Sequence, residues 1–220
     1  MSVSRETLTL ASGPAHDLHA LTLPSLDSAA MDRLDLFLRL LLDWNNRINL
    51  VARTDPAGIR QRHIEDSLQL LPLLPAGDGP LVDLGSGAGF PGLILAIASQ
   101  RPVHLVEADH RKAAFLTEAV ARLALSHVTV HPVRIESVRL QSFAVLTARA
   151  LAPLTILASH AERLLGSGGV AIFPKGRTAG AELSAASRDW IFDAERFASR
   201  TAPDAAILRL SNIRPRPAAP

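Results

Sequence analysis

Residues 81–92 read L-V-D-L-G-S-G-A-G-F-P-G, and this segment is the most informative part of the sequence about the fold. The apolar residues around Asp83 predict a short buried strand. Gly85, Gly87 and Gly89 then allow a sharp turn, because glycine takes positive φ at no steric cost, and the proline that follows suits the first turn of a helix. A strand, a glycine-rich turn and a helix N-terminus together form a nucleotide-binding corner.

The spacing of the glycines distinguishes two classes of nucleotide ligand. Dinucleotide-binding turns space their glycines G-x-G-x-x-G, and counting from Gly85 the third place falls on Phe90, which is too large for close helix–strand packing. The pattern D-x-G-x-G-x-G is instead similar to the first motif of Rossmann-like S-adenosylmethionine-dependent methyltransferases. Glu107 ends the next apolar strand about twenty residues later, where it can accept hydrogen bonds from the ribose of either ligand. The methyl donor is favoured over a dinucleotide and over a glycine loop without a ligand.

The composition excludes several kinds of site. The 220 residues include 23 basic and 21 acidic side chains, so a net charge of +2 gives no argument for nucleic-acid binding. The absence of cysteine excludes disulfides, thiolate metal sites and cysteine nucleophiles. The eight histidines form no H-E-x-x-H motif, and we expect no metal site. Without a signal peptide or a membrane-length apolar run, we expect a soluble cytoplasmic protein.

Ahead of the glycine turn, the sequence predicts a helical N-terminal lobe over residues 24–78. Apolar residues at helical spacing predict one helix over 28–44, and an Asp-Pro pair predicts the start of a second helix over 55–71. Prolines and glycines then end the lobe. Residues 1–23 show no hydrophobic period and are expected to form a flexible extension.

Residues 79–212 alternate between strand and helix patterns, which predicts a mostly parallel sheet with helices on both faces. The last two predicted strands, 190–198 and 205–212, are too close for a crossover helix and therefore predict an antiparallel hairpin. The proline-rich residues 213–220 are expected to be a disordered tail. The earlier predicted strands cover 81–84, 103–107, 128–131, 143–147 and 169–173, and the predicted helices cover 91–99, 110–124, 153–165 and 178–187.

A few polar side chains outside the glycine turn are candidates for function. Asn45 either contacts a substrate or caps the turn that ends the first helix. His63 and Asp66 share one helix face, which is either functional or simply solvated. Arg149 and Lys175 follow two strands at the carboxyl edge, where open α/β sheets bind ligands, although an exposed basic residue there needs no function.

Six sequence blocks occur in order along the chain. They are W-N-x-x-x-N-L at 44–50, R-H-I-x-D-S at 62–67, D-L-G-S-G-A-G-F-P-G at 83–92, E-x-x-x-R-K-x-x-F-L at 107–116, R-A at 149–150 and K-G at 175–176. Together they closely resemble the glucose-inhibited division protein B family, over about residues 30–212. That family is the small-subunit ribosomal RNA guanine-N7 methyltransferase, which acts on a guanine in a decoding-region loop. The resemblance implies a class I, Rossmann-like α/β fold with a seven-stranded, mostly parallel sheet that ends in an antiparallel hairpin.

The resemblance also implies a set of site residues. S-adenosylmethionine is expected to lie against the glycine turn, with Arg149 reaching the cofactor or the RNA. The implied cofactor-binding residues are Asp83, Gly85, Gly87, Gly89, Phe90, Glu107, Ile135, Glu136 and Arg149, of which Ile135 and Glu136 flank the adenine. The implied RNA-binding residues are Asn45, Arg60, Arg62 and Lys175, and the candidates near the reacting base are His63, Asp66, Arg149 and Lys175.

Methylation of guanine N7 requires no catalytic base, so no catalytic residue is assigned. The N7 lone pair lies in the plane of the base and carries no proton at neutral pH, and the sulfonium already activates the methyl group. The protein therefore has to align sulfur, methyl and N7 for a direct in-line transfer without a covalent intermediate. The absence of cysteine and of an N-P-P-Y motif argues against pyrimidine C5 and exocyclic amine methylation.

The implied partner is the small ribosomal subunit with its 16S rRNA, without DNA or membrane, and we expect a monomer. Because carboxylates lie near the arginines of the N-terminal lobe, we expect low affinity for naked RNA and reliance on the assembled particle. Three alternatives share the glycine motif: a methyltransferase for another RNA, a protein or a small molecule; a nicotinamide-dependent oxidoreductase; and a module that binds the nucleotide without catalysis.

Overall fold

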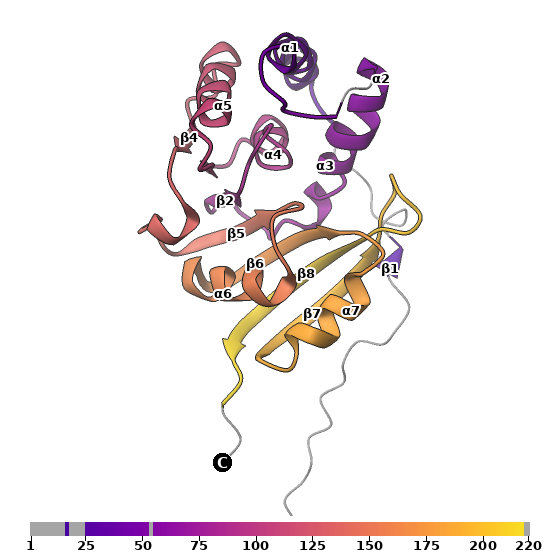
Figure 1. The fold of residues 1–220 in the computed structure, drawn as a ribbon, viewed down its shortest axis with the longest axis vertical. Helices are drawn as coiled ribbons and strands as arrows, with labels where there is room; N and C mark the ends of the chain where they lie inside the picture. Colours follow the sequence, from indigo (N-terminus) through magenta and orange to yellow (C-terminus); the bar gives the residue numbers. More distant parts are fainter. Residues whose placement is uncertain (1–15, 18–24, 53–54, 218–220) are drawn as a thin grey trace, which may run out of the picture.

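The structure is a computed structural model that describes residues 16–17, 25–52 and 55–217. These residues form one sheet with the strand order β1-β7-β8-β6-β5-β2-β3-β4, and helices cover both of its faces (Figure 1). The strands are β1 (His16–Asp17), β2 (Leu81–Leu84), β3 (Val103–Val106), β4 (Val128–His131), β5 (Phe143–Ala148), β6 (Leu165–Lys175), β7 (Trp190–Ala198) and β8 (Ala206–Pro215). The expected seven-stranded α/β sheet is confirmed in β2 to β8, and β1 adds a short strand at its edge.

The glycine motif lies at the carboxyl end of β2, between two parallel neighbours. β2 pairs in parallel with β3 and with β5, and all four of its residues are buried. A strand covered on both faces is usually apolar along its whole length. Three of the four residues of β2 follow this rule, and Asp83 is its single charged residue. The turn after β2 therefore has the ends of β3 and β5 on either side.

Two hydrophobic cores lie on opposite faces of the sheet. One contains residues of α1 (Ser28–Asn45), α4 (Gly92–Ser99) and α5 (His110–Arg122), which lie above the sheet in Figure 1. The other contains residues of α6 (Leu154–Leu164) and α7 (Ala179–Ala186), which lie below it. The parallel sheet with helices on both faces is thus confirmed.

The N-terminal lobe packs directly on the core through aromatic side chains. α1 starts at Asp27, whose carboxylate accepts a hydrogen bond from the Ala30 N–H at 2.7 Å. Phe37 of α1 is fully buried, and its ring meets Phe90 of the glycine motif edge-on at 5.5 Å and Phe115 of α5 at 6.2 Å. The lobe is therefore continuous with the core that carries the glycine turn.

The second helix of the lobe differs from a regular α-helix. It consists of α2 (Pro56–Ile59), a π-helical segment (Arg60–Glu65) and α3 (Asp66–Leu68), and a 3-10 turn follows at Leu71–Leu73. The sequence predicted one continuous helix over the same region. Local π-helical turns occur frequently at functional sites, and this one holds the first four positions of the R-H-I-x-D-S block, whose Asp66 and Ser67 belong to α3.

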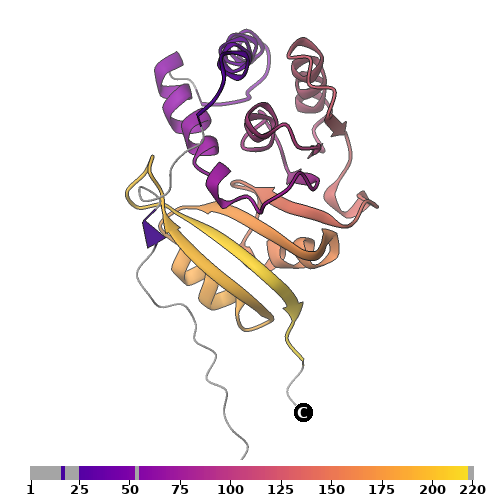
Figure 2. The same ribbon diagram turned by 180° about the vertical axis from the view of Figure 1, so that it is seen from behind.

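The chain ends in the predicted antiparallel hairpin of β7 and β8. β8 continues to Pro215, and the Arg216 N–H donates to the Asp189 carbonyl at 2.7 Å, so the strand runs past the expected end at residue 212. Residues 218–220 of the expected tail lie outside the described residues. Of the expected extension over 1–23, the described part is β1, which pairs in parallel with β7. The loop between β7 and β8 lies beside α3 in both views (Figures 1 and 2).

Candidate active site

The glycine turn has the backbone conformation that the sequence predicts. Gly85, Gly87 and Gly89 all have positive φ, at +63°, +53° and +90°. A β-carbon on Gly85 would lie 2.7 Å from Leu151 Cδ1, so the turn packs closely against the loop between β5 and α6. Any other residue at these positions would strain the backbone, and at Gly85 it would also displace Leu151.

Asp83, two residues before the turn, is fully buried. Thr147 Oγ1 donates a hydrogen bond to Asp83 Oδ1 at 2.6 Å, whereas Oδ2 has no hydrogen-bond partner among the described residues. Burial raises the pKa of Asp83 to about 6, and the hydrogen bond from Thr147 opposes this rise. A buried carboxylate oxygen without a donor is costly, so this atom fits a ligand that brings a cationic or N–H group.

Glu107 connects the turn with the start of α5. Its Oε2 accepts a hydrogen bond from the Gly87 N–H at 2.8 Å, and its Oε1 accepts one from the Asp109 N–H at 2.8 Å. Each carboxylate oxygen keeps a second lone pair, so the expected hydrogen bond from a ribose hydroxyl remains a prediction. In the structure itself, Glu107 fixes the shape of the glycine turn.

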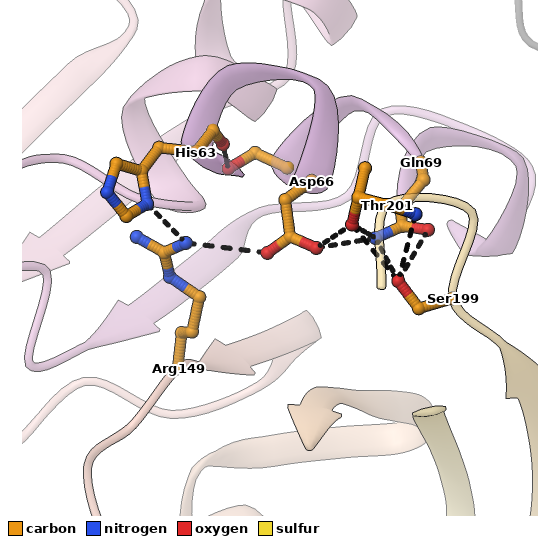
Figure 3. A network of polar contacts seen from close by, with 7 residues as sticks. His63, Asp66, Gln69, Arg149, Ser199 and Thr201 are labelled. Carbon is orange, nitrogen blue, oxygen red and sulfur yellow. Dashed lines mark hydrogen bonds and ion pairs between the residues drawn. The ribbon is translucent and has the colours of Figure 1, made fainter. Parts of the chain in front are cut away.

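Arg149 links the end of β5 to the N-terminal lobe (Figure 3). Its Nη1 donates a hydrogen bond to His63 Nδ1 at 3.0 Å and lies 3.4 Å from Asp66 Oδ2. The guanidinium carbon lies 5.1 Å from the ring centre of Phe90, and the His63 ring stacks on Phe90 at 5.0 Å. The helix face with His63 and Asp66 therefore points into the site, and the solvated-face interpretation is wrong.

These contacts define the protonation state of His63. Because an arginine can only donate hydrogen bonds, Nδ1 of His63 carries no proton and the neutral ring is protonated on Nε2. Burial and, secondly, the charge of Arg149 lower the pKa of His63. His63 is therefore neutral at pH 7 and positions Arg149 and Phe90 rather than carrying charge.

Asp66 is held by residues that the sequence reasoning missed. Its Oδ1 accepts hydrogen bonds from Gln69 Nε2 and from Thr201 Oγ1, both at 2.7 Å, and Gln69 Nε2 also reaches Ser199 Oγ at 3.2 Å. Gln69 is buried, and its Oε1 accepts from the Arg200 N–H at 2.8 Å. The one available signal was a glutamine within the apolar run L-Q-L-L-P-L-L; the loop residues follow no motif. The β7–β8 loop is thereby fastened to the lobe (Figure 3).

A cavity of about 830 Å³ lies beside Arg149, at the carboxyl ends of β5 and β6. Its walls come from the lobe helix, the β5–α6 loop, the end of β6 and the β7–β8 loop. Leu151 lines the cavity and packs against Gly85, and Arg149 lines it and covers Phe90. The cavity therefore adjoins the glycine turn, and its volume lies in the range of small-molecule sites.

Lys175 lines this cavity but does not project freely into it. Its Nζ donates hydrogen bonds to Glu182 Oε2 at 2.7 Å and to the Ala152 carbonyl at 2.9 Å, and the side chain is 10% exposed. Glu182 Oε2 also accepts from the Leu154 N–H at 3.0 Å. Burial would raise the pKa of Glu182, but the hydrogen bonds from Lys175 and Thr178 lower it. In the structure Lys175 therefore holds the β5–α6 loop, and its expected contact with RNA stays a prediction.

Two other residues expected to bind RNA have structural partners. Asn45 Oδ1 accepts from the N–H groups of Leu50 and Val51 at 2.8 and 3.0 Å, and its Nδ2 donates to the Val51 carbonyl. Asn45 therefore caps the turn, which was the alternative to substrate contact. Arg60 forms an ion pair with Asp35 of α1.

The remaining expected residues lie at the rim of the site or at the sheet edge beyond it. Arg62 is exposed and lines the cavity. Ile135 and Glu136 belong to a 3-10 turn after β4, where the Ile135 carbonyl accepts a hydrogen bond from Arg163 at 2.9 Å. Their expected contact with adenine stays a prediction.

Neither a metal centre nor a membrane span is found in the described part of the chain. Within residues 16–17, 25–52 and 55–217, no three histidine, cysteine or acidic side chains come together in a way that holds a metal ion. None of the helices in the same ranges is both long and apolar enough to cross a bilayer.

Solved structures of methyltransferases share this fold at low sequence identity. The M. jannaschii TYW2 protein in complex with AdoMet matches with a TM-score of 0.53 at 15% identity, over 67% of this chain and 74% of that chain. The glycopeptide N-methyltransferase MtfA complexed with S-adenosyl-L-methionine also has a TM-score of 0.53, at 12% identity, over 67% of this chain and 93% of that chain. At such identities the likeness concerns the fold alone, which is the Rossmann-like methyltransferase fold.

Sequence comparison is more specific. The Granulibacter bethesdensis protein named ribosomal RNA small subunit methyltransferase G is 55% identical over 182 residues, which cover 83% of this chain and 85% of that protein. The Acidiphilium cryptum protein of the same name is 55% identical over 186 residues, covering 82% and 84%. The family model GidB, described as rRNA small subunit methyltransferase G, matches residues 30–205. The chain therefore belongs to the rRNA small subunit methyltransferase G family, as the six sequence blocks predicted.

Proposed function

We propose that this protein transfers the methyl group of S-adenosylmethionine to N7 of one guanine in the decoding-region loop of 16S rRNA. Family membership supports an rRNA methyltransferase. The observation that carries the proposal is the junction between the glycine turn and the cavity, where Leu151 packs on Gly85 and Arg149 covers Phe90. A donor on the turn and a base in the cavity would meet at this junction.

The residues at the end of β2 fit the proposed methyl donor. S-adenosylmethionine supplies an activated methyl group on a sulfonium, which leaves as a neutral sulfide. Asp83 Oδ2 suits its ammonium group, because this buried oxygen has no partner among the described residues. The remaining proposed cofactor residues are Gly85, Gly87, Gly89, Phe90, Glu107, Ile135, Glu136 and Arg149.

The cavity fits a guanine whose N7 is methylated without any residue that removes a proton. Guanine N7 already presents a lone pair, so the chain has to orient the base rather than remove a proton. The purine gains positive charge as the new bond forms, and the carboxylates of Asp66 and Glu182 lie in the cavity wall. Arg149 and neutral His63, which contact each other and Phe90, would form the wall of the site against which the purine is oriented.

The proposal includes the assembled particle as substrate. With 23 basic and 21 acidic residues, the protein has little net charge with which to bind RNA of arbitrary shape. We propose that a monomer acts on small ribosomal subunits in the cytoplasm, with Arg62 at the cavity rim on the side of the RNA.

The chemistry is tested by incubating the protein with small ribosomal subunits that lack N7-methylguanine and with methyl-labelled S-adenosylmethionine. After digestion of the RNA, the label should elute as 7-methylguanosine. Label in another nucleoside or in ribosomal protein would overturn the proposed acceptor. Calorimetry with NADH in place of the donor should give no binding, and tight NADH binding would favour an oxidoreductase.

A further inference from the structure

A second, smaller cleft lies at the carboxyl edge of the sheet, between the turn after α1 and the first turn of α5. It has a volume of about 200 Å³ and is lined by Arg47, Ile48, Asn49, Asp109, Arg111 and Lys112. Three of these six residues are cationic and one is acidic. The two walls come from segments about sixty residues apart in the sequence, so the charge is concentrated by the fold and not by a basic run.

The single carboxylate in the cleft, Asp109, already has hydrogen-bond and ion-pair partners. Asp109 Oδ1 accepts hydrogen bonds from the N–H groups of Arg111 and Lys112, and its Oδ2 lies 3.4 Å from Arg111 Nη2. By contrast, the side chains of Arg47 and Lys112 have no hydrogen-bond or ion-pair partner within the described ranges. Among the described residues, the cleft thus presents two positive charges without an ion-pair partner, in a protein whose total net charge is only +2.

The cleft is mechanically connected to the glycine turn. Glu107 accepts hydrogen bonds from both Gly87 and Asp109, each at 2.8 Å, and so fixes the turn and the wall of the cleft to each other. β3, which precedes Asp109, and β5, which precedes Arg149, are the two neighbours of β2. Neighbouring strands lie about 4.8 Å apart, so the ends of β3 and β5 are separated by about 10 Å. The cavity and the cleft lie beyond these two ends, and a short stretch of RNA strand can reach from one to the other.

The size and lining of the cleft select its ligand. Sites for whole small molecules have volumes of about 300–1,000 Å³, and the cleft is smaller than this range. None of the six described lining residues is aromatic, so nothing there can stack on a base. Flexible cations around a small polar cleft instead fit a single phosphate group, with arginine and lysine as donors.

We propose that this cleft, here named the α1–α5 phosphate cleft, binds a backbone phosphate of the rRNA strand next to the target guanine. This inference rests on the proposed function, since it takes the cavity beside Arg149 as the acceptor site. The target base enters the cavity beyond β5, and the same strand continues along the outer side of the proposed cofactor site and leaves a phosphate between Arg47 and Lys112. This contact does not distinguish between bases. It fixes the position of the RNA strand relative to the protein.

The test compares a variant with both Arg47→Ala and Lys112→Ala, the charge-retaining variant Lys112→Arg, and a matched control, Arg122→Ala. Arg122 is exposed on the same helix, α5, ten residues and about 15 Å further along. Equilibrium binding to small ribosomal subunits that lack N7-methylguanine is measured over a range of salt concentrations, and calorimetry gives the Kd for S-adenosylmethionine. The labelled-methyl assay is run on the wild type in the same preparations.

The double variant should bind subunits about five- to tenfold more weakly. The slope of log Kd against log salt should fall by about 0.7, because the variant neutralises one phosphate fewer than the wild type. Its Kd for S-adenosylmethionine should stay within about twofold of the wild type, and Arg122→Ala and Lys112→Arg should bind subunits like the wild type. Unchanged subunit binding in the double variant, or an equal loss of S-adenosylmethionine affinity, would overturn the phosphate cleft alone. If the wild type places no label on guanine N7, the proposed function fails and this inference fails with it.

Discussion

The buried carboxyl group of Asp83 makes the stability of the fold depend on pH. It is fully buried, and burial raises its pKa to about 6. The unfolded chain, with the ordinary aspartate pKa near 4, releases this proton more easily than the folded protein does. The contribution of Asp83 to stability is therefore fully present below about pH 4 and is lost as the pH rises through about 6.

The substitution Asp83→Asn should remove this pH dependence. Between pH 4 and pH 7 the wild type should lose stability, relative to the variant, on the order of 3 kcal/mol. Urea unfolding at both pH values measures the difference, and calorimetry should show that the variant binds S-adenosylmethionine at least about tenfold more weakly. Parallel pH dependences in the two proteins would contradict a buried, titrating carboxylate at this position.

Thr201 acts on the site through Asp66, to which it donates a hydrogen bond at 2.7 Å. Thr201→Val keeps the shape of the side chain but removes this donor from a carboxylate that faces Arg149. A hydrogen bond to a charged group contributes about 1.5–3 kcal/mol, so we expect kcat/KM for methyl transfer to fall about tenfold or more, with the Kd for S-adenosylmethionine unchanged. Thr201→Ser, which keeps the hydroxyl, should restore the rate; full activity in the valine variant would show that the contact has no role.

At the scale of elements, the lobe helix brings the family block R-H-I-x-D-S to the sheet edge. Ile64 and Ser67 are buried in the lobe, while His63 and Asp66 reach Arg149 beyond β5. The π-helical segment Arg60–Glu65 contains both Ile64, on the buried face, and His63, on the face toward Arg149. The face with His63 and Asp66 contacts Arg149 because of where the helix lies on the sheet. The spacing of these residues in the sequence does not show this contact.

The β5–α6 loop is the element that contacts both the glycine turn and the cavity, and the pair of Lys175 and Glu182 holds it. Glu182→Gln would weaken the hydrogen bond between Lys175 and residue 182. Lys175 would then be positioned less well to donate to the Ala152 carbonyl. We expect methyl transfer to fall about tenfold, with most of the change in kcat, because the loop positions both halves of the junction. Glu162→Gln, on the exposed side of α6, is the control and should retain full activity. Equal rates for both variants would exclude this role of the pair.

At the scale of the whole molecule, the nearly balanced charge limits binding to RNA alone. Filter binding should show an affinity for deproteinised 16S rRNA at least about tenfold lower than for intact small subunits at physiological salt. The reason is that a shaped particle offers contacts which a few unpaired cations cannot provide. Equal affinity for both forms would contradict the dependence on the particle.

The sequence predicted the molecule well where local patterns dominate. The glycine turn, the strands β2 to β8, the capped helices and the terminal hairpin all follow from periodicity, turn residues and caps. Partners across the fold were not predictable in the same way. Gln69 meets Thr201 and Arg200, and Lys175 meets Glu182 and Ala152, because the tertiary arrangement of loops brings them together, and no single-sequence pattern encodes that arrangement.

The same reasoning applies to two expected RNA-binding residues that have partners within the protein. Asn45 was selected as a polar residue in the turn that ends the first helix, and Lys175 as a basic residue at the carboxyl edge of the sheet. A sequence does not show whether such a side chain already has a partner, and both do: Asn45 in its own turn and Lys175 on Glu182. Arg149 kept its predicted position because the carboxyl edge of β5 follows directly from the topology.

We propose that donor and acceptor meet where the glycine turn adjoins the cavity, so that one guanine of the small subunit is methylated at N7. The most direct measurement maps the labelled methyl group in small-subunit RNA by chemical cleavage at the modified base. We expect cleavage at a single guanine in the decoding-region loop, and none with subunits incubated without the protein. Label spread over several guanines, or located outside that loop, would show that the protein does not methylate this guanine specifically.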